Sequence, residues 1–371
     1  MAAIASTIRS LDVIPLAIPF TDGSSGTGLM PSKWTHLQIA LVRIETDDGL
    51  VGWGDGFAYS CLTATVAAIR DMVAPLVIGK PAPAAAEALD ALNLELQLRL
   101  HLHGRYGITM FAISAVDIAL WDIAAKRAGR SLAHFLSDAP RATIPAYASL
   151  VRYGDPALVT RFCEMAVEDG YRDVKLHEIT LPAIEAGRAA TGDDVRLTTD
   201  VNCNWSLASA HEMMPHMKRL GLYWVEEPVF PPDDAATLSG LERQYDIAIA
   251  SGENACTAVE FARTVPAITF PQPSVIKVGG ISEFLRVCDL AQIHGKTIMP
   301  HAPYFGPGYW ATAQLIAARE ECALFERFYI EPEAFCGHAI PLPKDGFIDV
   351  PDAPGLGFVP DEVVIKRYRL D

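Results

Sequence analysis

Three features are scarce or missing in this chain, and each absence narrows what the chain can be. Its seven cysteines are odd in number and stand at no paired spacing. This argues against a disulfide framework and favours free buried thiols in a reducing compartment. The first 20 residues lack a basic head followed by an apolar core, and we expect no apolar run of membrane length. These absences predict a soluble cytoplasmic protein with no membrane partner.

Basic residues are also in short supply. There are 30 Lys and Arg against 45 Asp and Glu, a formal net charge of −15, which argues against nucleic acid and anionic membranes as partners. A small anionic ligand stays compatible, because a metal ion and nearby lysines can invert the field inside a site. Half of the 371 residues are hydrophobic and 20% are charged, so the chain can bury a large core, and its length suits two domains.

The first 135 or so residues predict an α+β domain. Residues 4–20 and 34–56 have the character of strands, and the second run turns at Asp48-Gly49 as in a hairpin. Helical periodicity follows over 64–100, with a break at the Pro81–Pro83 segment, and again over 111–129. The Gly- and Ser-rich stretch Thr21–Ser32 predicts a mobile loop.

After Pro140 the rhythm changes to short apolar runs spaced by about 25 residues, which is the length of one strand–helix unit. There are eight of these runs, at 144–149, 173–177, 195–200, 222–226, 247–251, 274–278, 296–300 and 323–327. This count and period predict an α/β fold, a (β/α)8 barrel over 136–340. Residues 341–371 are expected to return to the first domain and to end in a strand, VVIKRYRL.

Three acidic residues end three successive runs of this series. Asp200, Glu226 and Glu253 are 26 and 27 residues apart. Parallel barrels keep their chemistry at the C-terminal ends of the strands, so these carboxylates are expected to converge there. Converging carboxylates repel one another unless a cation lies between them. Oxygen ligands without cysteine suit a hard ion, so the pattern predicts a Mg²⁺ site.

The chain resembles the enolase superfamily, and within it the mandelate racemase branch. The segments that carry the resemblance are VKLHE (174–178), LTTDVNCNW (197–205), WVEEP (224–228), SGEN (251–254), VIKVGG (275–280), MPHAPYFGPG (299–308) and LFER (324–327). The resemblance covers nearly the whole chain. It implies a capping domain over a barrel of seven or eight strands, Mg²⁺ held by Asp200, Glu226 and Glu253, and removal of the proton α to a carboxylate to give a metal-held enolate.

The resemblance also suggests acid–base residues on two sides of the metal. Lys175 and His177 stand two apart on one strand, so they share a face; the family often has Lys-x-Lys here, and His177 replaces the second lysine. His301 matches a histidine that approaches the substrate from the opposite face. An aspartate usually orients that histidine, but the matching position is Ser274. A serine cannot supply the negative charge, although it can hydrogen-bond.

Further residues beside these positions are candidates on the same grounds. Glu326 matches a glutamate that, if protonated, hydrogen-bonds the substrate carboxylate; the alternative is a surface salt bridge with Arg327. Four residues are expected to support the site: Asn202, Glu227, Asn254 and Lys277, the last at the end of the sixth strand. The loop Phe20–Ser32 and the turn Gly54–Tyr59 are expected to cover the barrel mouth. Side chains that could reach a substrate from the cap are His36, Phe57, Tyr59, His103, Arg105 and Tyr106.

The expected activity is that of a Mg²⁺-dependent lyase acting on a small carboxylate, in which a hydroxylated (sugar) acid is dehydrated to a 2-keto acid. A racemase, an epimerase or a sugar-lactone cycloisomerase on the same scaffold is an alternative, since bases on two faces suit it equally. A third alternative is a degenerate barrel that binds a metal without turnover, which the missing aspartate favours. The branch also implies a homo-oligomer.

Overall fold

The computed structural model describes residues 6–21, 23 and 34–371, and most of the predicted mobile loop lies outside them. Its N-terminal part is an antiparallel sheet of β1 (Ile8–Thr21), β2 (His36–Thr46) and β3 (Val51–Gly56), in the order β11-β1-β2-β3. The turn at Asp48-Gly49 joins β2 to β3, which confirms the hairpin. β11 (Glu331–Pro332) comes from the far end of the chain and pairs with β1.

Helices complete this domain, and the first and the longest of them pack directly on the sheet. They are α1 (Leu62–Ala68), the π-helical turn η1 (Ile69–Val73), α2 (Ala74–Val77), α3 (Ala86–Leu100), η2 (His101–His103), α4 (Ile108–Arg127) and α5 (Leu132–Leu136). α4 lies close against β3, because a Cβ atom added at Gly52 or Gly54 would come within 2.1 Å of the backbone oxygen of Ala119 or Ala115. The predicted α+β character is confirmed.

α4 corrects one expectation about apolar runs. Its 20 residues are long and apolar enough to cross a membrane, whereas no such run was expected. However, 89% of the apolar window is buried inside the molecule. The helix is predominantly apolar because the sheet and other helices enclose it, as in a core helix.

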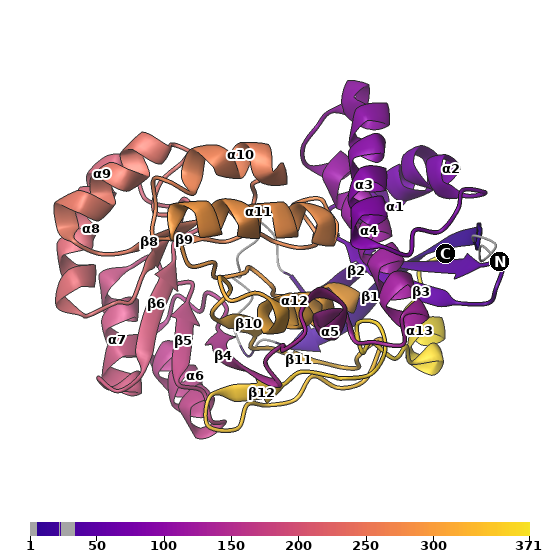
Figure 1. Cartoon of the computed structure of the whole chain (residues 1–371). Helices are drawn as coiled ribbons and strands as arrows, with labels where there is room; N and C mark the ends of the chain where they lie inside the picture. Colours follow the sequence, from indigo (N-terminus) through magenta and orange to yellow (C-terminus); the bar gives the residue numbers. More distant parts are fainter. Residues whose placement is uncertain (1–5, 22, 24–33) are drawn as a thin grey trace.

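The rest of the chain forms a barrel, seen on the left of Figure 1. Seven strands follow one another in parallel: β4 (Thr143–Ser149), β5 (Asp173–Leu176), β6 (Arg196–Asp200), β7 (Val225–Glu226), β8 (Ile249–Ser251), β9 (Phe270–Pro271) and β10 (Phe325–Phe328). Between β9 and β10 the ring closes through the segment at Ile298, which makes a single parallel bridge to Cys322. The (β/α) barrel is confirmed.

Seven helices alternate with these strands and cover the outside of the barrel (Figure 1). They are α6 (Pro156–Glu168), α7 (Leu181–Thr191), α8 (Leu207–Arg219), α9 (Ala235–Tyr245), α10 (Thr257–Thr264), α11 (Gly280–His294) and α12 (Pro307–Ala318). Helices such as α6, α8 and α10 are amphipathic and bury one apolar stripe against the strands, whereas α12 is buried on all sides under the capping domain.

The predicted sixth strand at 274–278 is wrong. The strand there is β9, Phe270–Pro271, and Ser274 accepts turn hydrogen bonds from the backbone of Lys277 and Val278. Pro271 and Pro273 cannot donate to a ladder, which ends the strand early. Ile276 owes its apolar character to burial under the capping domain, where its carbonyl accepts from the Phe57 backbone. Lys277 therefore follows the strand instead of ending it.

The predicted C-terminal strand is also wrong. Residues Glu362–Tyr368 form α13, capped by the Asp361 side chain, which accepts from the backbone of Val363 and Val364. The Leu370 backbone donates to Pro15 of β1, a contact in keeping with the predicted return to the first domain. On the way, β12 (Phe347–Asp349) pairs antiparallel with β4. The exact boundaries at 135 and 340 stay predictions.

Buried aspartates join the two parts. Asp117 of α4 accepts from the backbone and hydroxyl of Ser282 at the start of α11, at 3.0 and 2.6 Å. Asp55 of β3 accepts from the Gly308 backbone at the start of α12. Each carboxylate thus satisfies free N–H groups of a barrel helix from the other domain. This fixes the cap over the barrel mouth.

Candidate active site

The three predicted metal ligands meet at the C-terminal mouth of the barrel. Asp200 ends β6, Glu226 ends β7 directly beside it, and Glu253 lies two residues beyond β8. One ligand oxygen from each lies within 4.8 Å of the others. Asp200 and Glu226 are fully enclosed and Glu253 is largely so. Their convergence follows from chain order, because neighbouring parallel strands bring their ends to one edge.

The electrostatics of this cluster fit a divalent cation. Burial raises the pKa of Asp200 to about 6, against the opposing charge of Lys175. Burial and the Asp200 charge raise the pKa of Glu226 to about 7. Both shifts come mainly from burial, to which the neighbouring carboxylates add, and a bound cation would favour the ionised forms of both groups. A set of three carboxylates, all oxygen donors, matches the ligands that Mg²⁺ prefers.

Lys175 lies beneath the cluster. Its Nζ is 3.0 Å from Glu226 Oε1, 2.9 Å from Glu326 Oε1 and 3.9 Å from Asp200 Oδ2, and its side chain is fully buried. Burial disfavours the charged amine, but these carboxylates outweigh it and raise the pKa of Lys175 well above its usual value. Lys175 is therefore a fixed positive charge in this arrangement and not a base.

His177 shares the face of Lys175, as the spacing predicts. Its Nδ1 contacts the Leu150 carbonyl and its Nε2 lies 3.3 Å from Asp200 Oδ2. Burial lowers the pKa of His177 to about 4, and the Lys175 charge acts in the same direction. The ring is therefore neutral near pH 7. With Nδ1–H given to Leu150, Nε2 presents its lone pair to the site.

His301 stands on the other side, beside a different ligand. Its Nε2 lies 2.9 Å from Glu253 Oε2 and its Nδ1 lies 2.9 Å from the Tyr304 hydroxyl. Ser274, at the position where the resemblance expects an aspartate, contacts that same hydroxyl and not the histidine. The two predicted histidines thus flank the carboxylate cluster. Tyr304 was not predicted, because a tyrosine three residues after a histidine carries no signal of its own in the sequence.

Glu326 is buried, which corrects the salt-bridge alternative. It accepts from Ser149 Oγ at 2.7 Å and from the Ala302 backbone at 2.8 Å, besides its contact with Lys175. Although burial alone would favour the neutral acid, Lys175 and His301 lower the pKa of Glu326 to about 2. The protonated form expected from the resemblance is therefore not favoured in this arrangement.

The residues predicted beside the ligands differ in what they contact. The Asn202 backbone donates to Asp200 Oδ1 at 2.7 Å. Asn254 donates to Glu253 Oε1 at 2.9 Å and accepts from Lys277 Nζ at 2.7 Å. Glu227 has a left-handed backbone (φ 38°), and burial together with Glu253 raises its pKa well above the usual value. Ser274, as described, acts only through Tyr304.

A cavity of about 260 Å³ opens over the cluster. Both histidines and Lys277 line it, and the other lining residues are Trp34, Phe57, Tyr59, Asn202, Glu253, Asn254, Pro303 and Phe328. Of the six cap side chains proposed from the sequence, Phe57 and Tyr59 line this cavity; His36, His103, Arg105 and Tyr106 do not. Trp34 and Phe328 were missed. Their rings stack at 5.6 Å, and Trp34 also contacts Tyr59.

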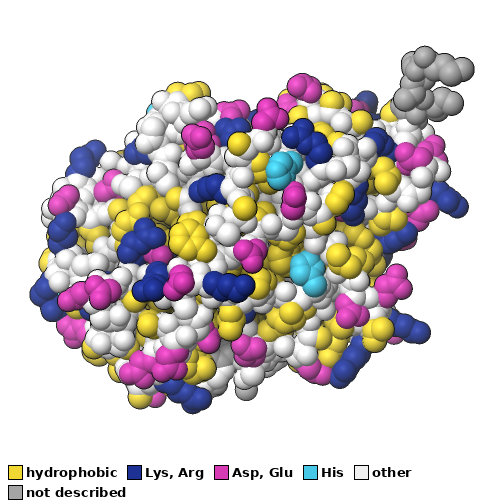
Figure 2. Space-filling view, turned by 60° about the horizontal axis from the view of Figure 1, so that its bottom comes forward, with side chains coloured by type: hydrophobic (Ala, Val, Ile, Leu, Met, Phe, Trp, Pro, Cys, Tyr) yellow, Lys and Arg dark blue, Asp and Glu magenta, His cyan; other side chains and the backbone are white. Residues whose placement is uncertain are grey.

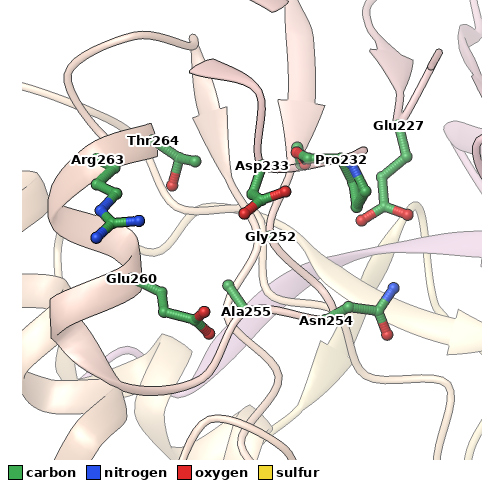
Figure 3. Close-up of a pocket in the computed structure, with 10 residues that line it drawn as sticks. Glu227, Pro232, Asp233, Gly252, Asn254, Ala255, Glu260, Arg263 and Thr264 are labelled. Atoms are coloured by element: carbon green, nitrogen blue, oxygen red, sulfur yellow. Dashed lines mark hydrogen bonds between the residues drawn. The ribbon is translucent and has the colours of Figure 1, made fainter. Parts of the chain in front are cut away.

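A second cavity of about 230 Å³ lies between the loop after β7 and α10. Figure 3 shows Glu227, Asp233, Glu260 and Arg263 around it, with Asn254 at its edge. Asn254 lines both cavities. The two hollows are therefore neighbours, separated by the residues that follow β7 and β8.

Comparison with known proteins agrees with this geometry. Residues 157–364 match the family described as enolase C-terminal domain-like, and residues 32–137 match the mandelate racemase / muconate lactonizing enzyme N-terminal domain. A 3,6-anhydro-alpha-L-galactonate cycloisomerase of Streptomyces coelicolor is 30% identical, covering 94% of each chain. An arabinonate dehydratase of Saccharolobus solfataricus is 28% identical, covering 90% of this chain and 91% of the relative.

Solved structures of related proteins are also similar to this chain over nearly its full length. An L-talarate dehydratase from Polaromonas sp., complexed with Mg and L-glucarate, superposes with a TM-score of 0.83 at 26% identity, covering 99% of this chain and 98% of the other. A racemase from Streptomyces coelicolor with bound magnesium reaches 0.83 at 25% identity, over 98% and 100% of the two chains. The chain belongs to the enolase superfamily, in the group of mandelate racemase and muconate lactonizing enzyme.

Proposed function

We propose that this protein is a Mg²⁺-dependent enzyme that removes the proton α to the carboxylate of a sugar acid and dehydrates the acid to a 2-keto acid. The observation that carries the proposal is the buried triad of carboxylates with a histidine beside each of two of them, His177 at Asp200 and His301 at Glu253. The named activities of the relatives, which include arabinonate, galactonate and talarate/galactarate dehydratases, support the substrate class.

Asp200, Glu226 and Glu253 would hold the cation. When bound, it would supply the positive charge that makes a proton α to a carboxylate acidic enough to be removed. Lys175 adds a second positive charge beneath the same oxygens and keeps Glu326 ionised. The remaining chemistry belongs to the protein's own acids and bases.

Two histidines are available for the proton transfers. Near pH 7 His177 is neutral and presents a lone pair at Nε2, so it can accept a proton. His301 faces the cavity from the side of Glu253. In the dehydration one base takes the α-proton, the C–O bond at the neighbouring carbon breaks, and an acid gives a proton to the departing hydroxyl, which leaves as water. The resulting enol then becomes the 2-keto acid.

The deciding experiment is a screen of aldonic and aldaric acids with Mg²⁺, in which 2-keto acid formation is followed with semicarbazide. We expect turnover of at least one acid, lost when the metal is chelated and restored by Mg²⁺. Running the same screen in D₂O, with NMR detection of deuterium at the α-carbon, tests proton removal independently of dehydration. The proposal fails if no acid exchanges its α-proton.

A cycloisomerase is the second candidate. It is favoured by the Lys175-x-His177 arrangement, and by two 30%-identical relatives named as cycloisomerases, of anhydrogalactonate and of D-galactarolactone. Adding lactones and anhydro acids to the screen separates the two: a cycloisomerase opens or moves a ring bond and gives a product with the mass of the substrate, whereas the dehydratase releases water. Product NMR identifies which occurs.

A cytoplasmic location and a homo-oligomeric state complete the proposal. All seven cysteines are free, and five of them are buried, which suits a reducing compartment. Size-exclusion chromatography with light scattering tests the assembly.

A further inference from the structure

The hydroxyl of Tyr304 lies between two buried side chains of the site. It is 2.9 Å from His301 Nδ1 and also contacts Ser274 Oγ. The rings of Tyr304 and His301 meet edge to face at 5.7 Å. All three side chains are buried, and Ser274 and Tyr304 are almost fully enclosed.

We propose that Tyr304, anchored by Ser274, positions the imidazole of His301 for proton transfer. The resemblance assigns this task to an aspartate at the position of Ser274, which this chain lacks. The inference rests on the proposed function, because it concerns one of the two bases named there. It also removes the reason for the degenerate-barrel alternative, since His301 does have an orienting partner.

A phenol can orient the imidazole of His301, but its hydrogen bonds differ from those of a carboxylate. A carboxylate only accepts hydrogen bonds, whereas a hydroxyl accepts one and donates another. Tyr304 can accept from Nδ1–H while its own proton goes to Ser274 Oγ. This leaves Nε2 directed at the cavity and at Glu253, 2.9 Å away. Both ring nitrogens of His301 then have a defined partner, which fixes the plane of the ring.

The segment that carries both residues is tied down. The Ala302 backbone donates to Glu326 Oε2 at 2.8 Å, the Pro303 carbonyl accepts from the Tyr59 hydroxyl at 2.6 Å, and the Tyr304 backbone donates to the Ala302 carbonyl. Tyr304 therefore cannot drift away from His301 without breaking contacts to both domains. A rigid partner is what a positioning role requires.

Packing alone does not account for the hydroxyl. Tyr309, five residues along, is equally buried, yet its hydroxyl has no hydrogen-bond partner among the described residues. A tyrosine can thus pack in this region without a hydrogen bond from its hydroxyl group. Tyr309→Phe is accordingly a matched control for Tyr304→Phe, since both substitutions remove one buried hydroxyl.

The kinetic test compares these variants on a substrate found by the screen. Tyr304→Phe is expected to lower kcat by about 10–100-fold with KM changed little, as for other partners that orient a working histidine. Ser274→Ala should cost about 2–10-fold, the value of one hydrogen bond. Adding Ser274→Asp to Tyr304→Phe places the carboxylate at the position where the family has it, and should restore part of the lost kcat. Tyr309→Phe should keep the wild-type kcat.

A second readout needs no substrate. In ¹⁵N-histidine NMR spectra, with His301 assigned through His301→Asn, the Nδ1 resonance of His301 should move in Tyr304→Phe and in Ser274→Ala but not in Tyr309→Phe. An unmoved resonance, or an unchanged kcat in Tyr304→Phe, overturns the inference. If the wild-type enzyme exchanges no α-proton, the proposed function fails, while the NMR comparison still decides whether Tyr304 holds His301.

Discussion

Each side chain of the carboxylate cluster lies at or just beyond the end of a different strand, and each has its own nearest protein partner. Asp200 has His177, Glu226 has Lys175, and Glu253 has His301 and Lys277. Although burial opposes it, the neighbouring His301 and Lys277 hold the pKa of Glu253 well below its usual range. Glu253 is therefore the ligand whose charge is most secure before a cation arrives, and its loss should be the most damaging to binding.

Replacing Glu253 with glutamine should weaken Mg²⁺ binding by at least about 100-fold, since it removes one of three charged ligands. Isothermal titration calorimetry with Mg²⁺ measures this directly. Glu185→Gln is the control, because Glu185 is an exposed carboxylate paired with Arg219 on the barrel surface. Equal affinities in the two variants would contradict the assigned metal site.

Replacing His301 with asparagine should reduce α-proton exchange by about 10²–10⁴-fold while substrate still binds, because a positioned acid–base group contributes on that order. The measurement is deuterium incorporation by NMR, together with KM. His294→Asn, at the exposed end of α11, serves as the control. Normal turnover in His301→Asn would remove this histidine from the mechanism.

The helices that start at the domain junction show how helix N-termini hold the two domains together. α11 and α12 begin under the cap, and each presents N–H groups that a buried aspartate of the cap accepts. Burial raises the pKa of Asp55 to about 7, and the hydrogen bond from Gly308 opposes the shift only in part. The folded protein therefore holds a proton on Asp55 more tightly than the unfolded chain does.

This makes the Asp55 contribution depend on pH. Its folded pKa lies above the unfolded value of 3.8, so its contribution to stability is fully present below about pH 4 and is lost as the pH rises through 7. The asparagine in Asp55→Asn does not titrate, so the variant lacks this contribution to the pH dependence of stability. The difference in unfolding free energy, wild type minus variant, should fall by up to about 4 kcal/mol between pH 4 and pH 8.

Urea unfolding at several pH values measures this difference. Asp138→Asn, a fully exposed aspartate near Arg130, should show no comparable trend. A wild-type-minus-Asp55→Asn difference that stays constant from pH 4 to pH 8 would mean that Asp55 is already ionised in the folded protein.

On the scale of the whole molecule, a net charge of −15 coexists with two buried lysines at the site, Lys175 and Lys277. On the face shown in Figure 2, acidic and basic side chains are interspersed. The excess negative charge is thus partly internal, in carboxylates at the barrel mouth and at the domain junction. A cation bound between the carboxylates at the barrel mouth should stabilise the entire fold, because its ligands lie at the ends of three strands.

We expect Mg²⁺ at about 100 times its Kd to stabilise the folded protein by about 2.7 kcal/mol, which should raise Tm by a few degrees. Differential scanning calorimetry with Mg²⁺ and with EDTA measures the shift. Asp200→Asn should fold and show little shift. A wild-type Tm that is indifferent to Mg²⁺ would contradict a cation site between these strands.

The amino-acid sequence alone determined the barrel and the meeting of Asp200, Glu226 and Glu253, because strand period and chain order force the ends of parallel strands to one edge. The place of the N-terminal domain as a cap followed from the family resemblance. It placed Lys175 and His177 on one face for the same local reason. At Ile276 the apolar period misled, because this residue is buried against the capping domain, and burial there and burial in a strand select the same residue types.

Only the tertiary structure decided what surrounds those residues. Ser274 meets Tyr304, 30 positions away, because the loops after β9 and the Ile298 segment fold over the same strand ends. Glu326 is enclosed and ionised through contacts with Ser149, Ala302 and Lys175, none of which is near it in the chain. Charges and hydrogen bonds act over a few ångströms of space, whatever the distance along the chain, so the partners of His301 and Glu326 become known only when the chain is folded.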